Sequence, residues 1–387
     1  MISLCRCIAI FFIASVAFSV QARQVIIPAY PQLSATAYFL MDANTGRVLV
    51  ENNADKLLPP ASMTKMMTSY IVSSEIDRDR LNPDDLVNIS VKAWKKGGSK
   101  MFVREGTEVS VKELLKGVII QSGNDASIAL AEHIAGSEEA FADVMNQQAA
   151  LLGMTNTVFK NATGWPADGH ISTVRDLAIL GRALTKDFPD HYKLYAEKYY
   201  SYNGINQPNR NRLLFTDKSV DGIKTGHTEE AGFGLTASAE KDGMRLISVV
   251  TGTRSENARA AESQKLLSYG FRYYQTLKLY SQGDAVNTVK VWKGQSDSVD
   301  LGLLDNVYLT IPRGSEKSLV ATINVDSTIK APLQQGQELG NIVVTLDDEE
   351  LVNVPVVALS SIEAAGFFSR TADGISLFFN RFFQTSQ

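Results

Sequence analysis

The stretch Leu58-Pro59-Pro60-Ala61-Ser62-Met63-Thr64-Lys65 decides how the larger part of this 387-residue chain folds. Proline is tolerated in a helix only within the first turn. Residues 63–76 contain neither Gly nor Pro and have apolar residues at helical spacing. The sequence therefore predicts a helix that begins close to Ser62. Ser62 and Lys65 are three residues apart, so they share one face of this helix and lie within side-chain reach.

Two further short motifs follow in order, Ser122-Gly123-Asn124 and Lys224-Thr225-Gly226. A Ser-x-x-Lys motif by itself is common by chance, but the three motifs in this order are much rarer. A serine hydroxyl becomes a good nucleophile when a base removes its proton. Lys65 can be that base if it is largely neutral. Burial and a nearby cation, for which Lys224 is the candidate, both lower a lysine pKa.

The second and third motifs can supply the other groups that such a site needs. Ser122 can relay a proton between Lys65 and a leaving group, and Asn124 can orient Lys65 or a substrate amide. A turn that only links two helices explains the same residues. The third motif lies just before an expected hairpin, where a strand edge can bind an extended peptide. Its Lys and Thr can donate to a terminal carboxylate, and Gly226 permits close backbone approach.

The surrounding elements predict an α/β or α+β domain over residues 23–279. One hairpin is expected around the turn at residues 42–46, and a second around the turn at residues 241–243. Most of the remaining chain has helical patterns, and Asp125 is expected to cap one of the helices. The expected helices cover residues 63–76, 111–115, 126–134, 138–152, 173–184 and 255–274.

From residue 280 to residue 360 the pattern changes to a smaller all-β domain. Short β-branched runs are broken by Gly, Pro, Asn and Asp, which is typical of a sandwich. Residues 361–387 then form an amphipathic pattern, whose apolar face consists of Phe368, Ile375, Phe378, Phe379 and Phe382. Such a C-terminal helix is expected to lie in a membrane interface. The alternative is a terminal helix that packs on the β-domain.

Residues 1–22 have the pattern of a secretory signal peptide. Arg6 precedes an apolar run of about 13 residues, and Val20-Gln21-Ala22 is a small-residue cleavage site. The run is shorter than the ~20 residues of a membrane span, although an uncleaved N-terminal anchor is the alternative. Cys5 and Cys7, the two cysteines of the chain, both lie in this segment. We expect export to the periplasm, with peripheral attachment to the inner membrane through the C-terminal helix.

The composition argues against several partners. The chain has 38 Lys and Arg against 42 Asp and Glu, a net charge of −4. Its basic residues do not run in a block, so nucleic acid is not expected to bind. No cofactor and no metal are expected, because no ligand spacing such as H-x-x-x-H is present among the histidines, which are His133, His170, His191 and His227.

On these motifs the chain resembles the low-molecular-mass penicillin-binding proteins of the D-alanyl-D-alanine carboxypeptidase group. The resemblance covers nearly the whole chain and extends to the β-domain and the amphipathic tail. It rests on residues 58–65, on Ile120-Gln121-Ser122-Gly123-Asn124-Asp125-Ala126 and on Asp221-Gly222-Ile223-Lys224-Thr225-Gly226-His227-Thr228. It implies a transpeptidase/β-lactamase-like catalytic domain, in which a five-stranded sheet has helices on both sides. It also implies a serine carboxypeptidase that removes the terminal D-alanine from peptidoglycan stem peptides and is acylated by β-lactams.

The same resemblance implies roles for individual residues. Ser62 would form the acyl-enzyme, and Lys65 would be the base for acylation and for activating the deacylating water. Backbone N–H groups of Ser62 and His227 would form the oxyanion hole. The residues implied to bind substrate are Lys224, Thr225, Gly226, His227, Arg259 and Arg210. For Arg259 and Arg210, the alternative is a surface position in a salt bridge.

One departure separates the neighbouring families. Class A β-lactamases carry a Glu on a loop between the second and third motifs, whereas residues 162–170 here contain no Glu and have Asp168 as their one carboxylate. Slow turnover of β-lactams is therefore expected, and His170 is expected to make structural hydrogen bonds. The alternatives are a β-lactamase or D,D-endopeptidase of the same superfamily, or a wall-binding protein without catalysis.

Overall fold

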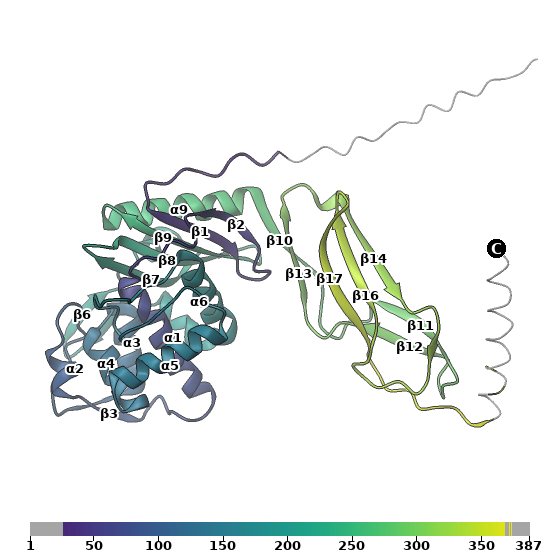
Figure 1. Ribbon diagram of the computed structural model, residues 1–387, viewed down its shortest axis with the longest axis horizontal. Helices are drawn as coiled ribbons and strands as arrows, with labels where there is room; N and C mark the ends of the chain where they lie inside the picture. Colours follow the sequence, from purple (N-terminus) through teal and green to yellow (C-terminus); the bar gives the residue numbers. More distant parts are fainter. Residues whose placement is uncertain (1–25, 368–370, 372, 374–387) are drawn as a thin grey trace, which may run out of the picture.

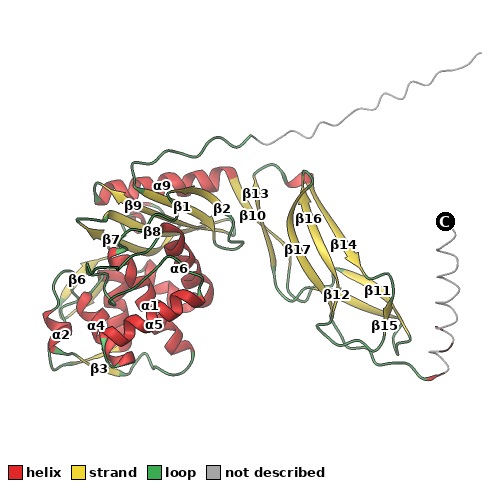
Figure 2. Ribbon diagram, in the orientation of Figure 1, coloured by secondary structure: helices red, strands yellow, loops and turns green. Residues whose placement is uncertain are grey.

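The computed structural model describes residues 26–367, 371 and 373 in two parts, a mixed helix-and-sheet domain followed by an all-β domain (Figures 1 and 2). This architecture confirms the predicted fold class. The predicted signal, residues 1–22, lies outside the described residues, as does most of the predicted amphipathic helix at residues 361–387. Within the described part of the chain, no helix is long and apolar enough to cross a membrane.

The central sheet of the first domain is antiparallel, with the strand order β2-β1-β9-β8-β7. Both predicted hairpins are present: β1 (Ala37–Asp42) with β2 (Val48–Asn52), and β8 (Gly232–Lys241) with β9 (Met244–Thr253). Pairing of β1 with β9 joins the hairpins into one sheet. The outer strand β7 (Val220–Thr228) was not predicted as a strand. It places the third motif on an open sheet edge.

Helices cover both faces of this sheet because successive side chains of a strand point to opposite faces. Tyr38 and Leu40 of β1 share a hydrophobic core with α9 (Glu256–Tyr273) on one face. Phe39 and Met41 belong to a larger core on the other face. The helices of that side are α1 (Lys65–Asp77), α2 (Val91–Lys95), α3 (Val111–Lys116), α4 (Asn124–Ala135), α5 (Glu138–Leu151), α6 (Val174–Asp187) and α7 (Pro189–Tyr192), and α8 (Leu213–Thr216) precedes β7.

Short elements connect the helices and shape the site. The helix predicted at residues 111–115 continues into a π-helix, η2 (Gly117–Gln121), which ends at the second motif. The other short elements are the 3₁₀ helices η1 (Ala61–Thr64), η3 (Lys193–Ala196) and η4 (Glu316–Ser318), and the small hairpins β3 (Leu86–Asn88) with β4 (Glu108–Ser110) and β5 (Tyr199–Tyr202) with β6 (Ile205–Pro208).

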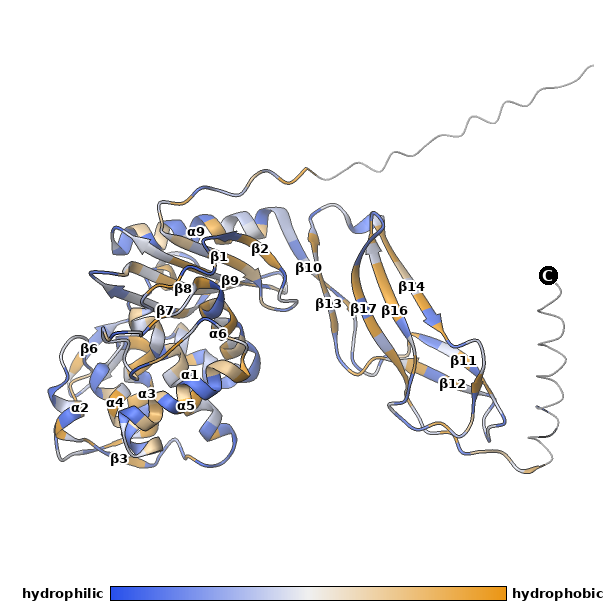
Figure 3. Ribbon diagram, viewed as in Figure 1, coloured by the Kyte–Doolittle hydropathy of each residue, from blue (hydrophilic) through white to orange (hydrophobic). Residues whose placement is uncertain are grey.

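The second domain consists of two sheets around one core that includes Leu309, Ile342 and Val356. Figure 3 shows the hydrophobic residues that run along β16 and β17. The smaller sheet pairs β10 (Tyr274–Tyr280) with β13 (Val307–Pro312), so β-pairing begins ahead of the expected boundary at residue 280. The larger sheet has the order β14-β16-β17-β12-β11-β15, with β11 (Asn287–Trp292), β12 (Ser298–Gly302), β14 (Leu319–Val325), β15 (Ile329–Lys330), β16 (Glu338–Leu346) and β17 (Glu349–Ala358).

A buried carboxylate joins the two domains. Asp42, at the end of β1, is 0% exposed. Its Oδ1 accepts hydrogen bonds from the backbone N–H groups of Asn44 at 2.7 Å and Thr45 at 3.2 Å. Its Oδ2 accepts from the hydroxyl of Thr310 in β13 at 2.9 Å and from the hydroxyl of Thr276 in β10. The first hairpin is thereby tied to the smaller sheet of the β-domain.

Candidate active site

Ser62 lies at the entrance to a helix, as predicted. It is in the 3₁₀ turn η1, which leads directly into α1. The preceding residue, Ala61, has φ 49°, a left-handed conformation that is uncommon for a residue with a side chain. Lys65 Nζ lies 3.0 Å from Ser62 Oγ. The three-residue spacing therefore brings the candidate nucleophile and base into hydrogen-bond contact.

Lys65 is 1% exposed and is surrounded by hydrogen-bond acceptors. Besides Ser62, its Nζ donates to Asn124 Oδ1 at 2.7 Å and to the Thr163 carbonyl oxygen at 2.5 Å. The two additional acceptors are an amide oxygen and a carbonyl oxygen, which cannot donate. When Lys65 is neutral, its two N–H groups can satisfy these acceptors, and its lone pair is then left for the Ser62 hydroxyl.

The surroundings of Lys65 favour the neutral amine. Burial, and after it the Arg210 guanidinium, lower the pKa of Lys65 to about 7. Among the charges, Arg210 has the largest effect on Lys65. Lys224, the cation expected from the sequence, is also coupled to Lys65 by mutual repulsion, which adds to the effect of burial in the lowered pKa of Lys224. A substantial fraction of Lys65 is therefore unprotonated near pH 7, as a general base requires.

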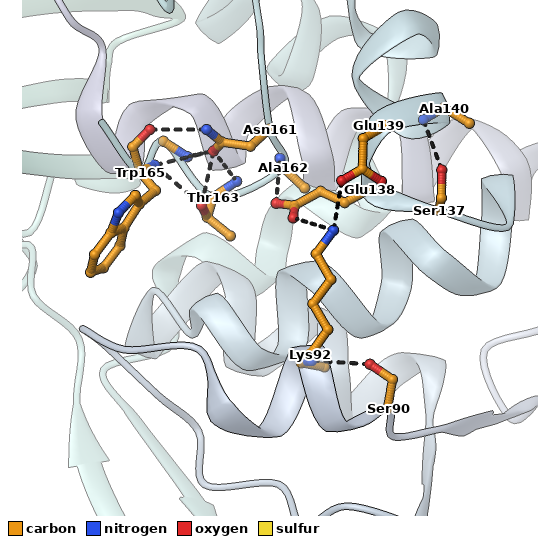
Figure 4. A network of polar contacts seen from close by, with 12 residues as sticks. Ser90, Lys92, Ser137, Glu138, Glu139, Ala140, Asn161, Ala162, Thr163 and Trp165 are labelled. Carbon is orange, nitrogen blue, oxygen red and sulfur yellow. Dashed lines mark hydrogen bonds and ion pairs between the residues drawn. The ribbon is translucent and has the colours of Figure 1, made fainter. Parts of the chain in front are cut away.

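A tight turn holds the Thr163 carbonyl against Lys65, and the hydrogen bonds within this turn are shown in Figure 4. Asn161 Oδ1 accepts hydrogen bonds from the backbone N–H groups of Thr163 at 3.1 Å, Gly164 at 2.8 Å and Trp165 at 3.1 Å. Gly164 has φ 76°, and a Cβ atom there would lie 1.8 Å from the Ala61 carbonyl oxygen. Only glycine fits this contact, which locks the turn onto the residue before Ser62.

Glu138 supports the same turn from the neighbouring helix α5 (Figure 4). Its Oε1 accepts a hydrogen bond from the Ala162 backbone N–H at 3.2 Å, and its Oε2 lies 3.1 Å from Lys92 Nζ. This support could not be predicted from the sequence, because Glu138 and Ala162 are brought together only by the fold.

Ser122 and Asn124 lie beside the cleft, where the turn after η2 leads into α4. Ser122 has φ 66°, and its buried hydroxyl has no hydrogen-bond partner among the described residues. Buried hydroxyls are nearly always paired, so an unpaired one beside the cleft is a candidate functional group. Asn124 Oδ1 accepts a hydrogen bond from Lys65 Nζ, and Asn124 Nδ2 donates to the Gly97 carbonyl at 2.7 Å. These two contacts fix the orientation of the Asn124 amide.

Asp125 does not occupy the capping position that the sequence suggested. Gly123 is the N-cap of α4, and Asp125 lies in the first turn. Its carboxylate accepts hydrogen bonds from the backbone N–H groups of Met101 at 3.0 Å and Phe102 at 2.9 Å. The result is a loop held against α4, and Ser99 of this loop lines the cleft.

The third motif lies inside β7, at the open edge of the sheet. Lys224 and Thr225 are buried, and Gly226 packs tightly against η1, since a Cβ atom there would lie 3.0 Å from the Pro60 carbonyl oxygen. His227 stacks on Phe233 of β8 with 3.9 Å between ring centroids. The predicted strand edge is therefore present beside Ser62, with the motif as part of the strand.

Several basic side chains lie close to this edge of β7. Arg259 Nη1 donates to the Gly226 carbonyl at 3.3 Å, and Arg210 Nε donates to the Gln121 carbonyl at 3.2 Å. Burial lowers the pKa of Lys224 well below its usual range, and repulsion from Lys65, Arg210 and Arg259 acts in the same direction. Such a group of cations favours a bound anion.

The cleft is a cavity of about 160 Å³ that unites most of the predicted residues. Lys65, Asn124 and Lys224 lie behind its wall. A larger groove of about 730 Å³ lies at the domain junction and contains none of the predicted site residues. Sequence reasoning did not identify the contributions of Ser99, Phe233 and Glu256. The residues that line the cleft are Ser62, Ser99, Ser122, Arg210, Thr225, Gly226, His227, Phe233, Glu256 and Arg259.

His170 has the structural role that was predicted for it. Its Nε2 lies 2.8 Å from Thr64 Oγ1, and its Nδ1 accepts from the Lys160 backbone N–H at 3.2 Å. Burial is the main cause that lowers the pKa of His170 to about 4, so the ring is neutral at pH 7. In the described part of the chain, no group of three or more His, Cys, Asp or Glu side chains is arranged to hold a metal ion.

Comparison with known proteins agrees with this geometry. The sequence profile of the D-alanyl-D-alanine carboxypeptidases, peptidase family S11, matches residues 24–255, and that of the penicillin-binding protein 5 C-terminal domain matches residues 274–364. D-alanyl-D-alanine carboxypeptidase DacA of Escherichia coli K12 is 44% identical over 365 residues, which cover 92% of this chain and 91% of the relative.

Solved structures show the same relationship. Penicillin-binding protein 5 from Haemophilus influenzae superimposes with a TM-score of 0.81 at 40% identity, covering 87% of this chain and 99% of that one. The ampicillin-bound penicillin-binding protein D2 from Listeria monocytogenes gives a TM-score of 0.57 at 31% identity, covering 62% of this chain and 98% of that one. The chain belongs to the S11 family of serine D-alanyl-D-alanine carboxypeptidases, and it carries a penicillin-binding protein 5 C-terminal domain.

Proposed function

We propose that Ser62 is the residue that forms the acyl-enzyme in this carboxypeptidase reaction. Its Oγ attacks the carbonyl carbon of the penultimate D-alanine of a stem peptide, while its proton passes to Lys65 Nζ. The oxyanion that forms accepts hydrogen bonds from the backbone N–H groups of Ser62 and His227. The observation that carries this proposal is the 3.0 Å contact between Ser62 and a Lys65 whose pKa is lowered to about 7.

The second half of the reaction uses the same groups. Collapse of the tetrahedral intermediate breaks the C–N bond, and the departing D-alanine amine takes a proton from Lys65, with Ser122 as the relay. A water molecule then attacks the ester, again with Lys65 as the base, and restores Ser62. The unpaired, buried Ser122 hydroxyl supports the relay. Asn124 keeps the Lys65 amine in place throughout.

We infer that the cations around β7 hold the terminal carboxylate of the substrate. Lys224 and Thr225 are placed to donate to it, Gly226 and His227 offer the strand edge, and Arg259 fixes that edge through the Gly226 carbonyl. Arg210 adds positive charge and lines the same cavity. A carboxylate in this group would relieve the mutual repulsion of the cations.

We further propose that β-lactams acylate Ser62 and are released slowly. A related protein is described in its ampicillin-bound form, and a β-lactam carries a carboxylate next to a reactive amide, as the natural substrate does. The loop at residues 162–170 has no Glu to activate a deacylating water. This favours a trapped acyl-enzyme over β-lactamase activity.

Labelling with a fluorescent penicillin tests the assignment, together with D-alanine release from a stem-peptide mimic. The wild type should label stoichiometrically and release D-alanine, and Ser62→Ala should do neither. Equal labelling of Ser62→Ala would contradict the proposal. A folded wild type that takes no label would favour the wall-binding alternative.

The location of the protein is a separate proposal, and the sequence supports it. We infer export through residues 1–22 and attachment to the outer surface of the inner membrane through residues 361–387, beyond a catalytic domain at 23–279 and a β-domain at 280–360. Deletion of residues 363–387 should release the protein from membranes on fractionation. Retention of the truncated protein would assign the attachment to another part of the chain.

A further inference from the structure

Glu138 of α5 is not among the residues that line the catalytic cleft, but its buried side chain contacts the turn that holds Lys65 (Figure 4). We propose that Glu138 is a positioning residue of the carboxypeptidase reaction, which fixes the turn at residues 161–165 so that this turn orients the Lys65 amine toward the nucleophile. The inference deepens the proposed function and rests on it, because it takes Lys65 as the general base.

The orientation of Lys65 depends on where its acceptors lie. A neutral amine has two N–H groups and one lone pair, so two fixed acceptors decide where the lone pair points. Lys65 Nζ contacts Asn124 Oδ1 at 2.7 Å and the Thr163 carbonyl oxygen at 2.5 Å. If the Thr163 carbonyl moved away, one N–H group could turn toward Ser62 Oγ. The lone pair would then no longer face the proton that a general base has to remove.

Glu138 is tied to this turn and to a neighbouring helix. The residue is 5% exposed, and its Oε1 accepts a hydrogen bond from the Ala162 backbone N–H at 3.2 Å. Its Oε2 lies 3.1 Å from Lys92 Nζ of α2. The Ala162 carbonyl accepts from the Thr68 hydroxyl of α1 at 2.7 Å. Both backbone polar groups of Ala162 are thus fixed directly before the carbonyl of Thr163.

Asn161 closes the turn but does not attach it to the rest of the domain. Its side chain bonds to Thr163, Gly164 and Trp165, all inside the turn. Within the described residues, the hydrogen bonds that join residues 161–165 to other parts of the chain come from Lys65 and Thr68 of α1 and from Glu138 of α5. Glu138 therefore supplies the attachment that is independent of the helix carrying the base.

The charge of Glu138 has an effect that can be separated from its support of the turn. Burial is the main cause that lowers the pKa of Lys65 to about 7, and the charged groups around it are Arg210, Asp125, Lys96 and Glu138, with Lys224 on β7. The two carboxylates raise this pKa, so removal of the Glu138 charge should lower it. Loss of the charge is thus expected to move the midpoint of the pH profile of acylation to lower pH, whereas loss of the support is expected to lower the plateau.

The test measures the rate constant of acylation by a fluorescent penicillin, expressed per labelled site, from pH 5 to pH 9. This quantity counts reactive molecules alone, so a smaller folded fraction does not change it. The plateau should fall by about 10 to 10²-fold in Glu138→Ala, because small displacements of a catalytic group are costly. For D-alanine release the loss should lie in kcat rather than KM, since the groups around β7 that bind the substrate carboxylate are unchanged.

Two further variants separate position from charge. Glu138→Gln keeps one oxygen for the Ala162 N–H group, so its plateau should recover to within about threefold of the wild type while its midpoint still moves to lower pH. Glu139→Gln is the matched control. Glu139 also pairs with Lys92, at 2.9 Å, but its side chain is 76% exposed and makes no hydrogen bond to the turn. This control should keep the plateau and the midpoint of the wild type.

A double variant shows whether Glu138 acts through Lys65. Lys65→Met removes the amine that the turn orients. In that background Glu138→Ala should change the residual rate of acylation by less than about threefold, because two changes that act through the same group are not additive. A substitution that merely loosened the domain would lower the rate by the same factor in both backgrounds.

Two results would overturn the inference: a plateau for Glu138→Ala within about threefold of Glu139→Gln, or a full loss that persists in the Lys65→Met background. In either case the wild type would still take the label and release D-alanine, and the proposed function would stand. Failure of the proposed function itself would look different, with no label and no D-alanine release in the wild type, or with Lys65→Met as fast as the wild type.

Discussion

The catalytic cleft and the domain junction each contain a fully buried ionisable side chain, Lys65 and Asp42, but the two side chains have different surroundings. Lys65 is 1% exposed and Asp42 is 0% exposed. The Asp42 carboxylate accepts hydrogen bonds from two backbone N–H groups and two threonine hydroxyls. Lys65 donates to uncharged oxygens, and the strongest charge acting on it is the repulsive one of Arg210.

This difference shows that burial alone does not decide what an ionisable group does. A buried carboxylate that is fully hydrogen-bonded holds its neighbours in place. A buried amine without a close counter-charge gives up its proton near neutral pH and becomes a base. The same degree of burial thus gives rigidity at the junction and reactivity in the cleft.

The largest expected effect breaks the reactive side of this comparison. Ser62→Ala should lower kcat/KM for D-alanine release by at least about 10⁴-fold, because the substitution removes the nucleophile and leaves only binding and the oxyanion hole. Release of D-alanine from a stem-peptide mimic measures it, and an unchanged melting temperature serves as the control for folding. Parental activity in a folded Ser62→Ala would show that the chemistry lies elsewhere.

Removing the base should have the next largest effect. Lys65→Met keeps a long buried side chain but cannot accept a proton, so acylation by a fluorescent penicillin should slow by about 10² to 10⁴-fold. Lys112→Met is the matched control, since Lys112 is an exposed lysine paired with Asp84 on the surface. A rate for Lys65→Met within about threefold of that control would argue against Lys65 as the base.

The pH dependence of acylation sharpens the comparison. Burial and Arg210 disfavour the ammonium form and lower the pKa of Lys65 to about 7, so the neutral base predominates above that pH. The acylation rate constant should therefore level off above about pH 7 and fall about tenfold per unit well below it. Stopped-flow measurements from pH 5 to pH 9 would record this profile.

Arg210→Gln tests the cause of the profile. Loss of the guanidinium charge should raise the pKa of Lys65 and move the midpoint of the acylation profile to higher pH. A midpoint that stays in place would assign the lowered pKa to burial alone. A wild-type midpoint near that of an ordinary lysine would contradict the description of the cleft.

The smallest effect on catalysis is expected at the junction. Asp42→Ala leaves its hydrogen-bond donors without their acceptor and should reduce stability by about 1–3 kcal/mol, visible as a lower melting temperature. Asp42→Asn keeps one acceptor oxygen and should fall between the wild type and Asp42→Ala. Acylation rates should stay within about twofold of the wild type. A loss of acylation as large as that of Lys65→Met would mean that the junction also shapes the cleft.

The predictable parts of the site were those that depend on local spacing. The contact of Ser62 with Lys65 follows from helical geometry, and the pairing of Asn124 with Lys65 was anticipated from its motif. The Thr163 carbonyl could not be predicted, because a backbone acceptor leaves no mark in the sequence. The role of Asp125 was misassigned because capping rules consider near neighbours, whereas its partners Met101 and Phe102 lie 24 and 23 residues upstream.

The fold followed a similar division. Both hairpins of the catalytic sheet and the all-β character of the second domain were visible in local patterns. Strand β7 was missed since its sequence, with Gly222 and Gly226 among polar residues, reads as a loop. It becomes a strand through pairing with β8 along its length. The short strands β12 and β15 were missed because so few residues carry little pattern.

The order in which this chain can fold follows from Asp42. Its strand β1 is near the start of the chain, yet it pairs with β9, and its carboxylate bonds to hydroxyls 234 and 268 residues later. Contacts between such distant segments form slowly, since long loops must close first. The first strand to emerge from a ribosome is thus among the last to be completed. Until β9 has been made, β1 carries an unpaired sheet edge, which would be a natural site for a chaperone to bind.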